Sequence, residues 1–182
     1  MSPSGYLMGA VQMTSGADRD KNLSTALRLV GEAADLGARL VALPENFAFM
    51  GPEEQRIAGA EPVDGPTVGA LREPGKTANT SVLVSDEGAI AATYRKIHLF
   101  DVNIPDGARY AESQTVVPGD RAVTAETPLV RIGLTVCYDL RFPELYRALM
   151  HPPCDLIVVP AAFTYTTGQA HWELLLRARA VE

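Results

Sequence analysis

Short apolar runs alternate with helical patterns along this chain, and the alternation is typical of α/β proteins. Residues 6–13 are predicted as a buried strand, 22–37 as a helix and 39–43 as a second strand, which makes a βαβ beginning. Further predicted elements are a short helix at 66–72, a hairpin of strands 81–85 and 89–94, an ordered loop at 101–120, strands at 122–125 and 129–136, a helix at 143–150, a strand at 155–159 and a helix from residue 170 onward. We expect mixed sheets with helices outside them, in a single domain over residues 1–182.

The predicted helix at 22–37 has an apolar face at helical spacing, and Gly37 suits its C-terminal end. The residues of that face are Leu23, Leu27, Val30 and Ala34. We expect this face to pack against the two strands that flank the helix.

Composition and charge limit the classes of protein to consider. Hydrophobic residues make up 47% of the 182 residues, which fits a packed core rather than a disordered chain. The formal net charge is −6 and basic residues form no cluster, so nucleic acid is not an expected partner. The chain has two cysteines, no signal-peptide pattern and no apolar run of about 18–20 residues. We therefore expect a cytoplasmic protein without a disulfide and without a membrane partner.

Cys137 ends an apolar, β-branched run that predicts a buried strand, and Pro143 begins a helical pattern soon afterwards. A thiol at a strand-to-helix turn lies near backbone N–H groups that no helical carbonyl accepts. Such donors favour a thiolate and, later in a reaction, a negatively charged oxygen. These residues alone leave two interpretations open: a nucleophile, or a buried thiol that fills space, as we interpret Cys154.

Two other strand-like runs end at a residue suited to catalysis. Glu45 lies among apolar and aromatic neighbours, which suits a carboxylate to general-base catalysis, although a helix cap or an exposed loop side chain is the alternative. Lys96, if it points inward, supplies a fixed positive charge that stabilises a thiolate and an oxyanion. The alternative for Lys96 is the solvated end of a strand. Spacing along the chain does not show whether Glu45, Lys96 and Cys137 meet.

Three blocks of the sequence resemble the signature blocks of the nitrilase superfamily of carbon–nitrogen hydrolases, in the same order. They are Leu-Pro-Glu-Asn at 43–46, Tyr-Arg-Lys-Ile-His-Leu-Phe-Asp at 94–101 and Val-Cys-Tyr-Asp-Leu-Arg-Phe-Pro-Glu at 136–144. The resemblance extends from residue 6 to residue 182. It implies an αββα sandwich, a catalytic triad of Glu45, Lys96 and Cys137, no cofactor and no metal, and a homodimer when the chain is complete.

The resemblance also implies roles for residues outside the triad. Glu112, within Tyr-Ala-Glu-Ser at 110–113, matches a second family glutamate that orients the lysine or places water and substrate; an exposed loop carboxylate is the alternative. The backbone N–H of Tyr138 would join Lys96 in stabilising an oxyanion, and Phe163 and Thr164 would lie at the rim of the substrate pocket. We interpret three further residues as structural: His98, His171 and Trp172.

Two further blocks, at 142–149 and 170–180, resemble the branch of the superfamily that contains deaminated glutathione amidase and omega-amidase. This resemblance implies an amidase that cleaves a small linear amide to an acid and ammonia through a thioester on Cys137. Short dicarboxylic monoamides and deaminated glutathione are the expected substrates.

The chain is shorter than the family pattern in two places. We expect a C-terminal part to be missing after Glu182, and residues 74–77 to bridge a gap where the family has a further strand, beside the strand at 39–43. Unpaired strand edges expose backbone donors and acceptors. A second class of function therefore stands beside the enzyme: a catalytically inactive fragment, or an interaction module of the same ancestry that pairs its open edges with a partner.

Overall fold

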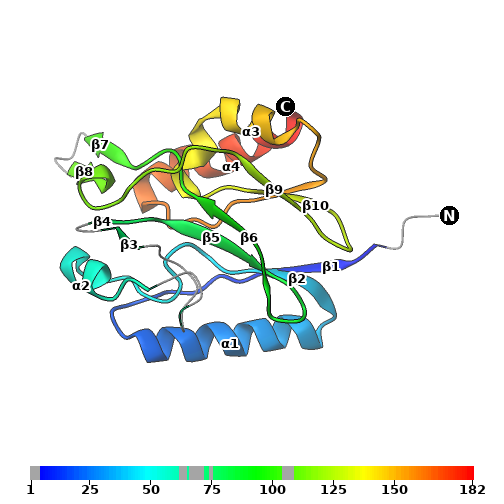
Figure 1. Ribbon diagram of the computed structural model, residues 1–182, viewed down its shortest axis with the longest axis horizontal. Helices are drawn as coiled ribbons and strands as arrows, with labels where there is room; N and C mark the ends of the chain where they lie inside the picture. Colours follow the sequence, from blue (N-terminus) through cyan, green and yellow to red (C-terminus); the bar gives the residue numbers. More distant parts are fainter. Residues whose placement is uncertain (1–4, 62–64, 66–71, 74–75, 104–108) are drawn as a thin grey trace. The chain divides into compact units, whose positions relative to one another are not determined.

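The computed structural model describes residues 5–61, 65, 72–73, 76–103 and 109–182 (Figure 1). It contains two compact units, residues 1–56 and residues 57–182, and each is described by itself. Both units contain parallel strands joined through a helix, as expected of an α/β chain. The single domain over residues 1–182 stays a prediction.

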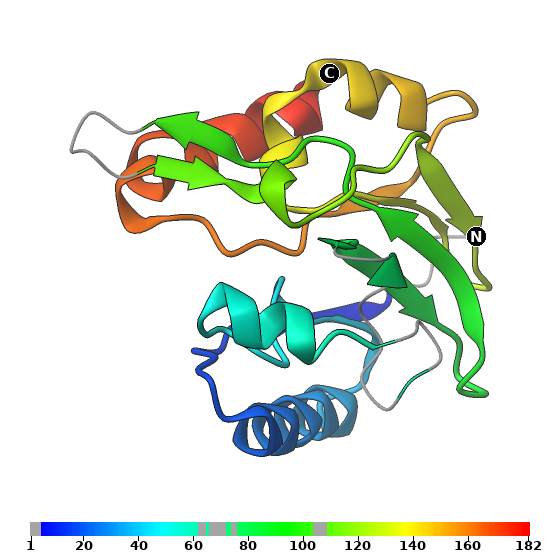
Figure 2. The ribbon, with the colours of Figure 1, turned by 60° about the vertical axis from the view of Figure 1, so that its left-hand side comes forward.

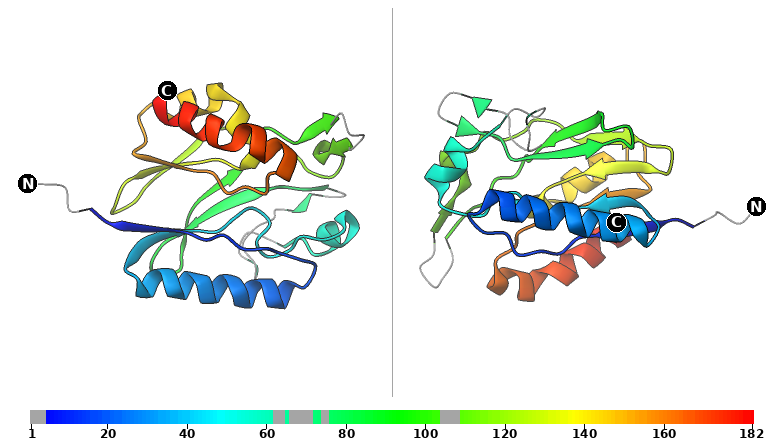
Figure 3. Two further views of the ribbon diagram at one scale, coloured as in Figure 1. Left: turned by 180° about the vertical axis from the view of Figure 1, so that it is seen from behind. Right: turned by 90° about the horizontal axis from the view of Figure 1, so that it is seen from below.

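The first unit is built on a βαβ motif. Strands β1 (Leu7–Ala10) and β2 (Ala38–Ala42) are parallel neighbours, and helix α1 (Arg19–Asp35) connects them and packs on both (Figure 3). Helix α2 (Glu53–Ala58) follows and crosses the boundary between the units. The predicted strand–helix–strand order is thus confirmed.

Helix α1 begins three residues before its predicted start, because Asp18 caps it. The Asp18 carboxylate accepts a hydrogen bond from the backbone N–H of Lys21 at 3.0 Å and so satisfies one of the donors at the start of the helix. At the other end Gly37 has φ 91°, a left-handed conformation that glycine adopts without a steric penalty. The predicted C-terminal stop is therefore confirmed.

The predicted buried face of α1 is wrong in part: Leu27 is 73% exposed, and the buried side chains are those of Asn22 and Ala26. The Asn22 amide donates to the carbonyl oxygens of Gly16 at 2.8 Å and Ala48 at 3.0 Å, and its oxygen accepts from the Gly16 N–H at 3.1 Å. A polar side chain with all these partners can face inward. The prediction counted apolar residues only, and so it placed the inward face at residues 23 and 27 rather than at 22 and 26.

The second unit contains a three-stranded sheet in the order β11-β10-β9. Its strands are β9 (Val123–Glu126), β10 (Arg131–Leu134) and β11 (Leu156–Val158), with β10 antiparallel to β9 and parallel to β11. Helices α3 (Pro143–Leu149) and α4 (Tyr165–Val181) lie on one side of this sheet (Figures 1 and 3). Helix α4 begins five residues before its predicted start, with Thr164 as the residue that precedes its first turn.

Further strands of the second unit pair two by two (Figure 2). They are β3 (Arg72–Glu73), β4 (Lys76–Thr77), β5 (Thr80–Val84), β6 (Ile90–Arg95), β7 (Asp101–Asn103) and β8 (Arg109–Ala111), followed by the 3₁₀ helix η1 (Glu112–Gln114). The β5–β6 hairpin is confirmed, with Gly88 at φ 81° in its turn.

One prediction for this region is corrected by the structure, and another falls largely on residues that the structure does not describe. The loop predicted at 101–120 is wrong in part, because β7 and β8 pair there as antiparallel strands of three residues each, too short for an alternating pattern to be recognised. The helix predicted at 66–72 falls on residues 66–71, which lie outside the described residues, and on Arg72, which belongs to strand β3.

Gly119 fixes the backbone just after β6. Its N–H donates to the Lys96 carbonyl oxygen at 2.8 Å, while the Lys96 N–H donates to the Asn79 carbonyl oxygen at 2.8 Å. A Cβ atom on Gly119 would lie 2.3 Å from the carbonyl oxygen of Arg95, which is far inside van der Waals contact. Only glycine lets these two backbones approach so closely, and the approach holds the segment that carries Lys96.

We expect Gly119→Ala to lower the free energy of unfolding by about 1–3 kcal/mol, because the added methyl group must push the Arg95 backbone away. Urea denaturation measures the change. Gly31→Ala is the matched control: no atom lies within 4 Å of a Cβ placed at this exposed position of α1. Alanine there should leave stability equal or raise it by up to about 1 kcal/mol. Equal stabilities for the two variants would contradict the close approach.

Candidate active site

Cys137 lies at a sharp backbone turn at the end of the β10 segment. Val136 is extended, with φ −141°, and Cys137 then has φ 47°, a left-handed conformation that is uncommon for a residue with a side chain. The backbone N–H of Cys137 donates to the Pro160 carbonyl oxygen at 2.8 Å, and its side chain is buried. The predicted strand-to-helix turn is found, and the strained backbone marks it as a functional candidate.

A 3₁₀ helix, η2 (Cys137–Arg141), begins at the cysteine itself and leads into α3. The sequence predicted a helix only from Pro143, because five residues are too few to show a helical period. Helix α4 contacts η2, and the Arg179 guanidinium donates to the Leu140 carbonyl oxygen at 3.1 Å. This bond satisfies a carbonyl near the C-terminal end of η2 and so stabilises the 3₁₀ helix that begins at Cys137.

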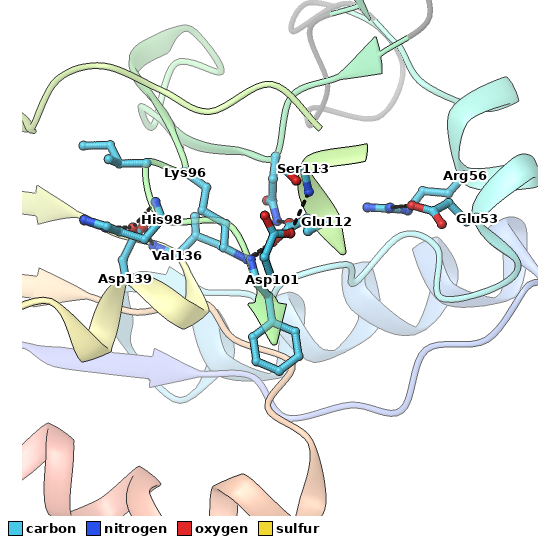
Figure 4. A network of polar contacts seen from close by, with 12 residues as sticks. Glu53, Arg56, Lys96, His98, Asp101, Glu112, Ser113, Val136 and Asp139 are labelled. Carbon is cyan, nitrogen blue, oxygen red and sulfur yellow. Dashed lines mark hydrogen bonds and ion pairs between the residues drawn. The ribbon is translucent and has the colours of Figure 1, made fainter. Parts of the chain in front are cut away.

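Lys96 and Glu112 form a buried ion pair within the second unit (Figure 4). The Lys96 ammonium donates to Glu112 Oε2 at 2.8 Å, and the side chains are only 2% and 12% exposed. The Glu112 carboxylate also accepts from the Phe100 N–H at 2.7 Å and from the Asn79 amide at 3.2 Å. Lys96 is therefore not a solvated strand end and Glu112 is not an exposed loop carboxylate; both alternatives are wrong.

Asp139, two residues after the cysteine, is a site residue that the sequence analysis missed. Its carboxylate is fully buried and accepts four hydrogen bonds. One comes from the Tyr94 hydroxyl. The other three come from the His98 ring, the His98 N–H and the Val136 N–H; His98, Val136 and Asp139 are labelled in Figure 4. Burial, together with the charge of Asp139, raises the pKa of the Tyr94 hydroxyl above its usual range. The only sequence signal was a carboxylate between Tyr138 and Leu140, close to the cysteine.

Arg141 joins the residues that the resemblance assigned to substrate binding. Its guanidinium carbon lies 5.7 Å from the ring centre of Tyr138 and 5.5 Å from that of Phe163, both within cation–π range. It also donates to Nδ1 of His171 at 3.3 Å. The sequence analysis missed Arg141, which lies four residues after Cys137 in η2.

The other residues of this rim have structural contacts. The Phe163 ring packs edge-on against Trp172 with a centroid distance of 4.8 Å, in agreement with a structural role for Trp172. The hydroxyl group of Thr164, the residue before α4, lies 2.7 Å from that of Thr167 in the first turn of the helix. Whether Phe163 and Thr164 contact a substrate stays a prediction.

Glu45 belongs to the first unit, whereas Lys96, Glu112 and Cys137 belong to the second. It begins the turn at 45–48, where Asn46 has a left-handed φ of 57° and the Phe47 carbonyl oxygen accepts from the Ser15 hydroxyl at 2.8 Å. The turn is thus held tightly and Glu45 is half-buried. The meeting of Glu45 with Cys137 stays a prediction.

Other chemical possibilities were searched over the described residues. No group of three His, Cys, Asp or Glu side chains there is placed to hold a metal ion. No helix in the described part of the chain combines the length and apolar character needed to cross a membrane. Cys154 is half-buried, donates to the Leu149 carbonyl oxygen at 3.0 Å and has its pKa raised by burial, as a space-filling thiol would.

We expect Glu112→Ala to lower the free energy of unfolding by about 3–5 kcal/mol, because it leaves the Lys96 ammonium buried without its carboxylate. Glu112→Gln should cost less, since the amide oxygen can still accept from Lys96 and Phe100. Glu126→Ala is the matched control: Glu126 pairs with Arg131 at 2.6 Å but is 72% exposed, so its loss should cost no more than about 1 kcal/mol. Chemical denaturation of the three variants measures the difference, and equal losses would contradict the buried pair.

The chain is similar to known proteins over most of its length. The chain matches the family described as carbon-nitrogen hydrolase over residues 7–74 and 69–182. It is 42% identical over 200 residues to deaminated glutathione amidase of Synechocystis sp., an alignment that covers 97% of this chain and 74% of that protein. It is 36% identical over 195 residues to the human omega-amidase NIT2, covering 97% of this chain and 71% of that protein.

A solved structure confirms the predicted fold class. The NitFhit protein of C. elegans superposes with a TM-score of 0.86 at 34% identity, over 96% of this chain and 48% of that one. The present chain thus spans about half of that solved chain. The nitrilase-type α/β fold expected from the three sequence blocks is therefore found.

The alignments also bear on the internal shortening. The alignment with the Synechocystis protein extends over 200 positions, more than the 182 residues of this chain, so that relative has residues without a counterpart here. The two family matches meet at residues 69–74. This overlap adjoins residues 74–77, where the sequence analysis placed the missing strand.

Proposed function

Since the chain belongs to the carbon–nitrogen hydrolase family, we propose that it is an amidase that cleaves a small linear amide to a carboxylic acid and ammonia through a thioester on Cys137. One observation carries the proposal: the second unit holds a buried thiol on a left-handed turn and a buried lysine that a glutamate fixes in place. The first group is suited to attack a carbonyl carbon, and the second supplies the charge that the resulting oxyanion needs.

In the first half of the reaction, the Cys137 sulfur attacks the amide carbonyl carbon and its proton passes to the Glu45 carboxylate. The carbonyl oxygen becomes an oxyanion, which the Lys96 ammonium and the backbone N–H of Tyr138 stabilise. The Cys137 N–H already donates to Pro160, so the next N–H of η2 is the better oxyanion donor. The tetrahedral intermediate then expels ammonia, which takes its proton from Glu45, and a thioester remains.

In the second half, Glu45 takes a proton from a water molecule, which attacks the thioester carbonyl carbon. The intermediate collapses to the carboxylic acid, and the Cys137 thiolate that leaves takes a proton back from Glu45. Glu45 therefore acts as base and then as acid in each half of the reaction. The Lys96–Glu112 pair contributes a charge that is already in position, so no reorganisation is needed when the oxyanion forms.

We expect Cys137→Ala to abolish ammonia release, because no sulfur remains to form the thioester, and Cys137→Ser to reduce it nearly as far. Cys154→Ser is the matched control and should leave the rate unchanged. An enzyme-coupled ammonia assay measures the rates. Folded wild-type protein that releases no ammonia from any short amide would contradict the proposed function and favour the inactive fragment or interaction module.

The chemistry near Cys137 favours an amide that also carries a carboxylate. Arg141 lies on the same 3₁₀ helix as the cysteine, beside the Tyr138 and Phe163 rings, and an arginine fork is suited to bind a carboxylate with two hydrogen bonds. Deaminated glutathione, from which one relative takes its name, is an amide with carboxylate groups. We therefore include short dicarboxylic monoamides in the proposal.

We expect Arg141→Met to lower kcat/KM for succinamate by about 10–100-fold, because one charge-assisted contact is lost. The uncharged amide butyramide should lose much less, since it has no carboxylate for the guanidinium to bind. Arg147→Met is the control, because Arg147 is 62% exposed and pairs with Glu182 at the surface. Equal losses for succinamate and butyramide would contradict a carboxylate-binding role for Arg141.

A further inference from the structure

A fully buried carboxylate lies against the turn that carries Cys137. Asp139 Oδ1 accepts from the backbone N–H of His98 at 3.0 Å and from the His98 ring nitrogen Nδ1 at 2.8 Å. Oδ2 accepts from the Tyr94 hydroxyl at 2.7 Å and from the Val136 N–H at 3.0 Å. Each oxygen thus has two donors, which offsets the cost of removing the charge from water.

The donors come from two segments that each carry a residue of the proposed mechanism. Tyr94 and His98 stand on either side of Lys96, two residues away in each direction. Val136 directly precedes Cys137. One carboxylate therefore joins the backbone next to the lysine to the backbone next to the nucleophile (Figure 4).

Elementary chemistry fixes the hydrogen positions in this network. An ionised carboxylate only accepts, so His98 must carry a hydrogen on Nδ1, and the Tyr94 hydroxyl must point its hydrogen at Asp139. The Tyr94 oxygen in turn accepts from the Ile97 N–H at 3.3 Å. The His98 ring stacks on Phe142, with centroids 3.7 Å apart and planes 7° from parallel. Each member is therefore held by at least two contacts.

We propose that Asp139 is a positioning residue, which holds the left-handed turn of Cys137 in register with Lys96 through Tyr94 and His98. It does not contact the substrate, and its effect on the rate rests on the proposed amidase function. The left-handed conformation of Cys137 costs free energy, so the turn needs an interaction that holds it. The bond from the Val136 N–H to the Asp139 carboxylate spans that turn. The bonds from His98 to the same carboxylate attach the turn to the segment that carries Lys96.

Asparagine at position 139 tests the proposal with almost no change in shape. Its amide group has one oxygen and one NH₂ group, so whichever way it points, the NH₂ group faces a backbone N–H, of either Val136 or His98. Two donors facing each other repel, and the backbone beside Cys137 or beside Lys96 must shift. A displacement of about 1 Å at reacting groups lowers a rate by roughly 100-fold.

The experiment measures Cys137 directly as well as turnover. Asp139→Asn, Tyr94→Phe, His98→Ala and His98→Asn are compared with the wild-type chain in kcat and KM for succinamate. In parallel, the rate of Cys137 alkylation by iodoacetamide, itself a short amide, is followed over a range of pH by peptide-resolved mass spectrometry. Trypsin separates the Cys137 peptide from that of Cys154, because Arg141 and Arg147 lie between them. Cys154 is the internal control in every sample.

We expect Asp139→Asn to lower kcat by about 10–100-fold with KM changed by less than about threefold, and to slow Cys137 alkylation without slowing that of Cys154. His98→Asn should recover part of the loss seen in His98→Ala, since its amide nitrogen can donate to Asp139 in place of Nδ1. Tyr94→Phe, which removes one donor, should give an intermediate loss.

A reduced melting temperature with unchanged kcat per folded molecule and unchanged Cys137 alkylation would overturn the proposal, because Asp139 would then only stabilise the fold. If Asp139→Asn does not fold, the Tyr94→Phe variant and the two His98 variants decide by the same measurements. If the wild-type chain hydrolyses no amide, the proposed function fails, while the alkylation rates still show whether Asp139 positions Cys137.

Discussion

A lysine ammonium that is almost completely removed from water governs the organisation of the second unit. Lys96 is 2% exposed, and such a burial is tolerated only where a carboxylate and further hydrogen bonds offset the lost hydration. Glu112 supplies the carboxylate, and Glu112 is itself held by the Phe100 N–H and the Asn79 amide. Three segments, which contain Asn79, residues 96–100 and Glu112, are therefore tied to one charge, and a change in any of them moves the lysine.

The nucleophile turn depends on a second buried charge. Asp139 gathers donors from the β6 end and from the residue before Cys137, while Arg179 of α4 contacts the end of η2 from outside. Two carboxylates, Glu112 and Asp139, thus bracket the segment 94–101 that carries Lys96. Since Asp139 is fully buried and Glu112 is only 12% exposed, their hydrogen bonds are stronger than surface contacts, and the segment between them has little freedom.

The sequence predicted the site residues that end apolar runs, and it missed a residue whose role depends on hydrogen bonds to distant parts of the chain. Cys137 and Lys96 end apolar runs, so strand patterns alone directed attention to them, and the geometry of the turn and the buried pair agrees. Asp139 stands in the same block as Cys137, yet its partners Tyr94 and His98 lie more than 40 positions away in the chain. Spacing along the sequence does not indicate which of many carboxylates will accept hydrogen bonds from residues so far away.

Local patterns failed for similar reasons elsewhere. Asn22 faces inward on α1 because its side chain bonds to two backbone groups of Gly16, just before the helix, and to the carbonyl oxygen of Ala48, 26 positions further along the chain. A face deduced from apolar residues cannot include it. The β7–β8 pair and η2 are too short to have a period. Arg141 was overlooked because an arginine in a polar turn is ordinary until its contacts with Tyr138 and Phe163 are known. Tertiary contacts, rather than local propensity, decided each of these cases.

The backbone conformation of Cys137 also limits which nucleophiles this scaffold can acquire. At φ 47° a side chain with one heavy atom on Cβ is tolerated, whereas a second branch would crowd the adjacent carbonyl group. A change from thiol to serine hydroxyl therefore leaves the turn intact, but a change to threonine would have to straighten it and break the link to Pro160. A mutational path that preserves this turn therefore excludes threonine at position 137 and admits serine, whose hydroxyl fits the turn but is a weaker nucleophile than the thiol.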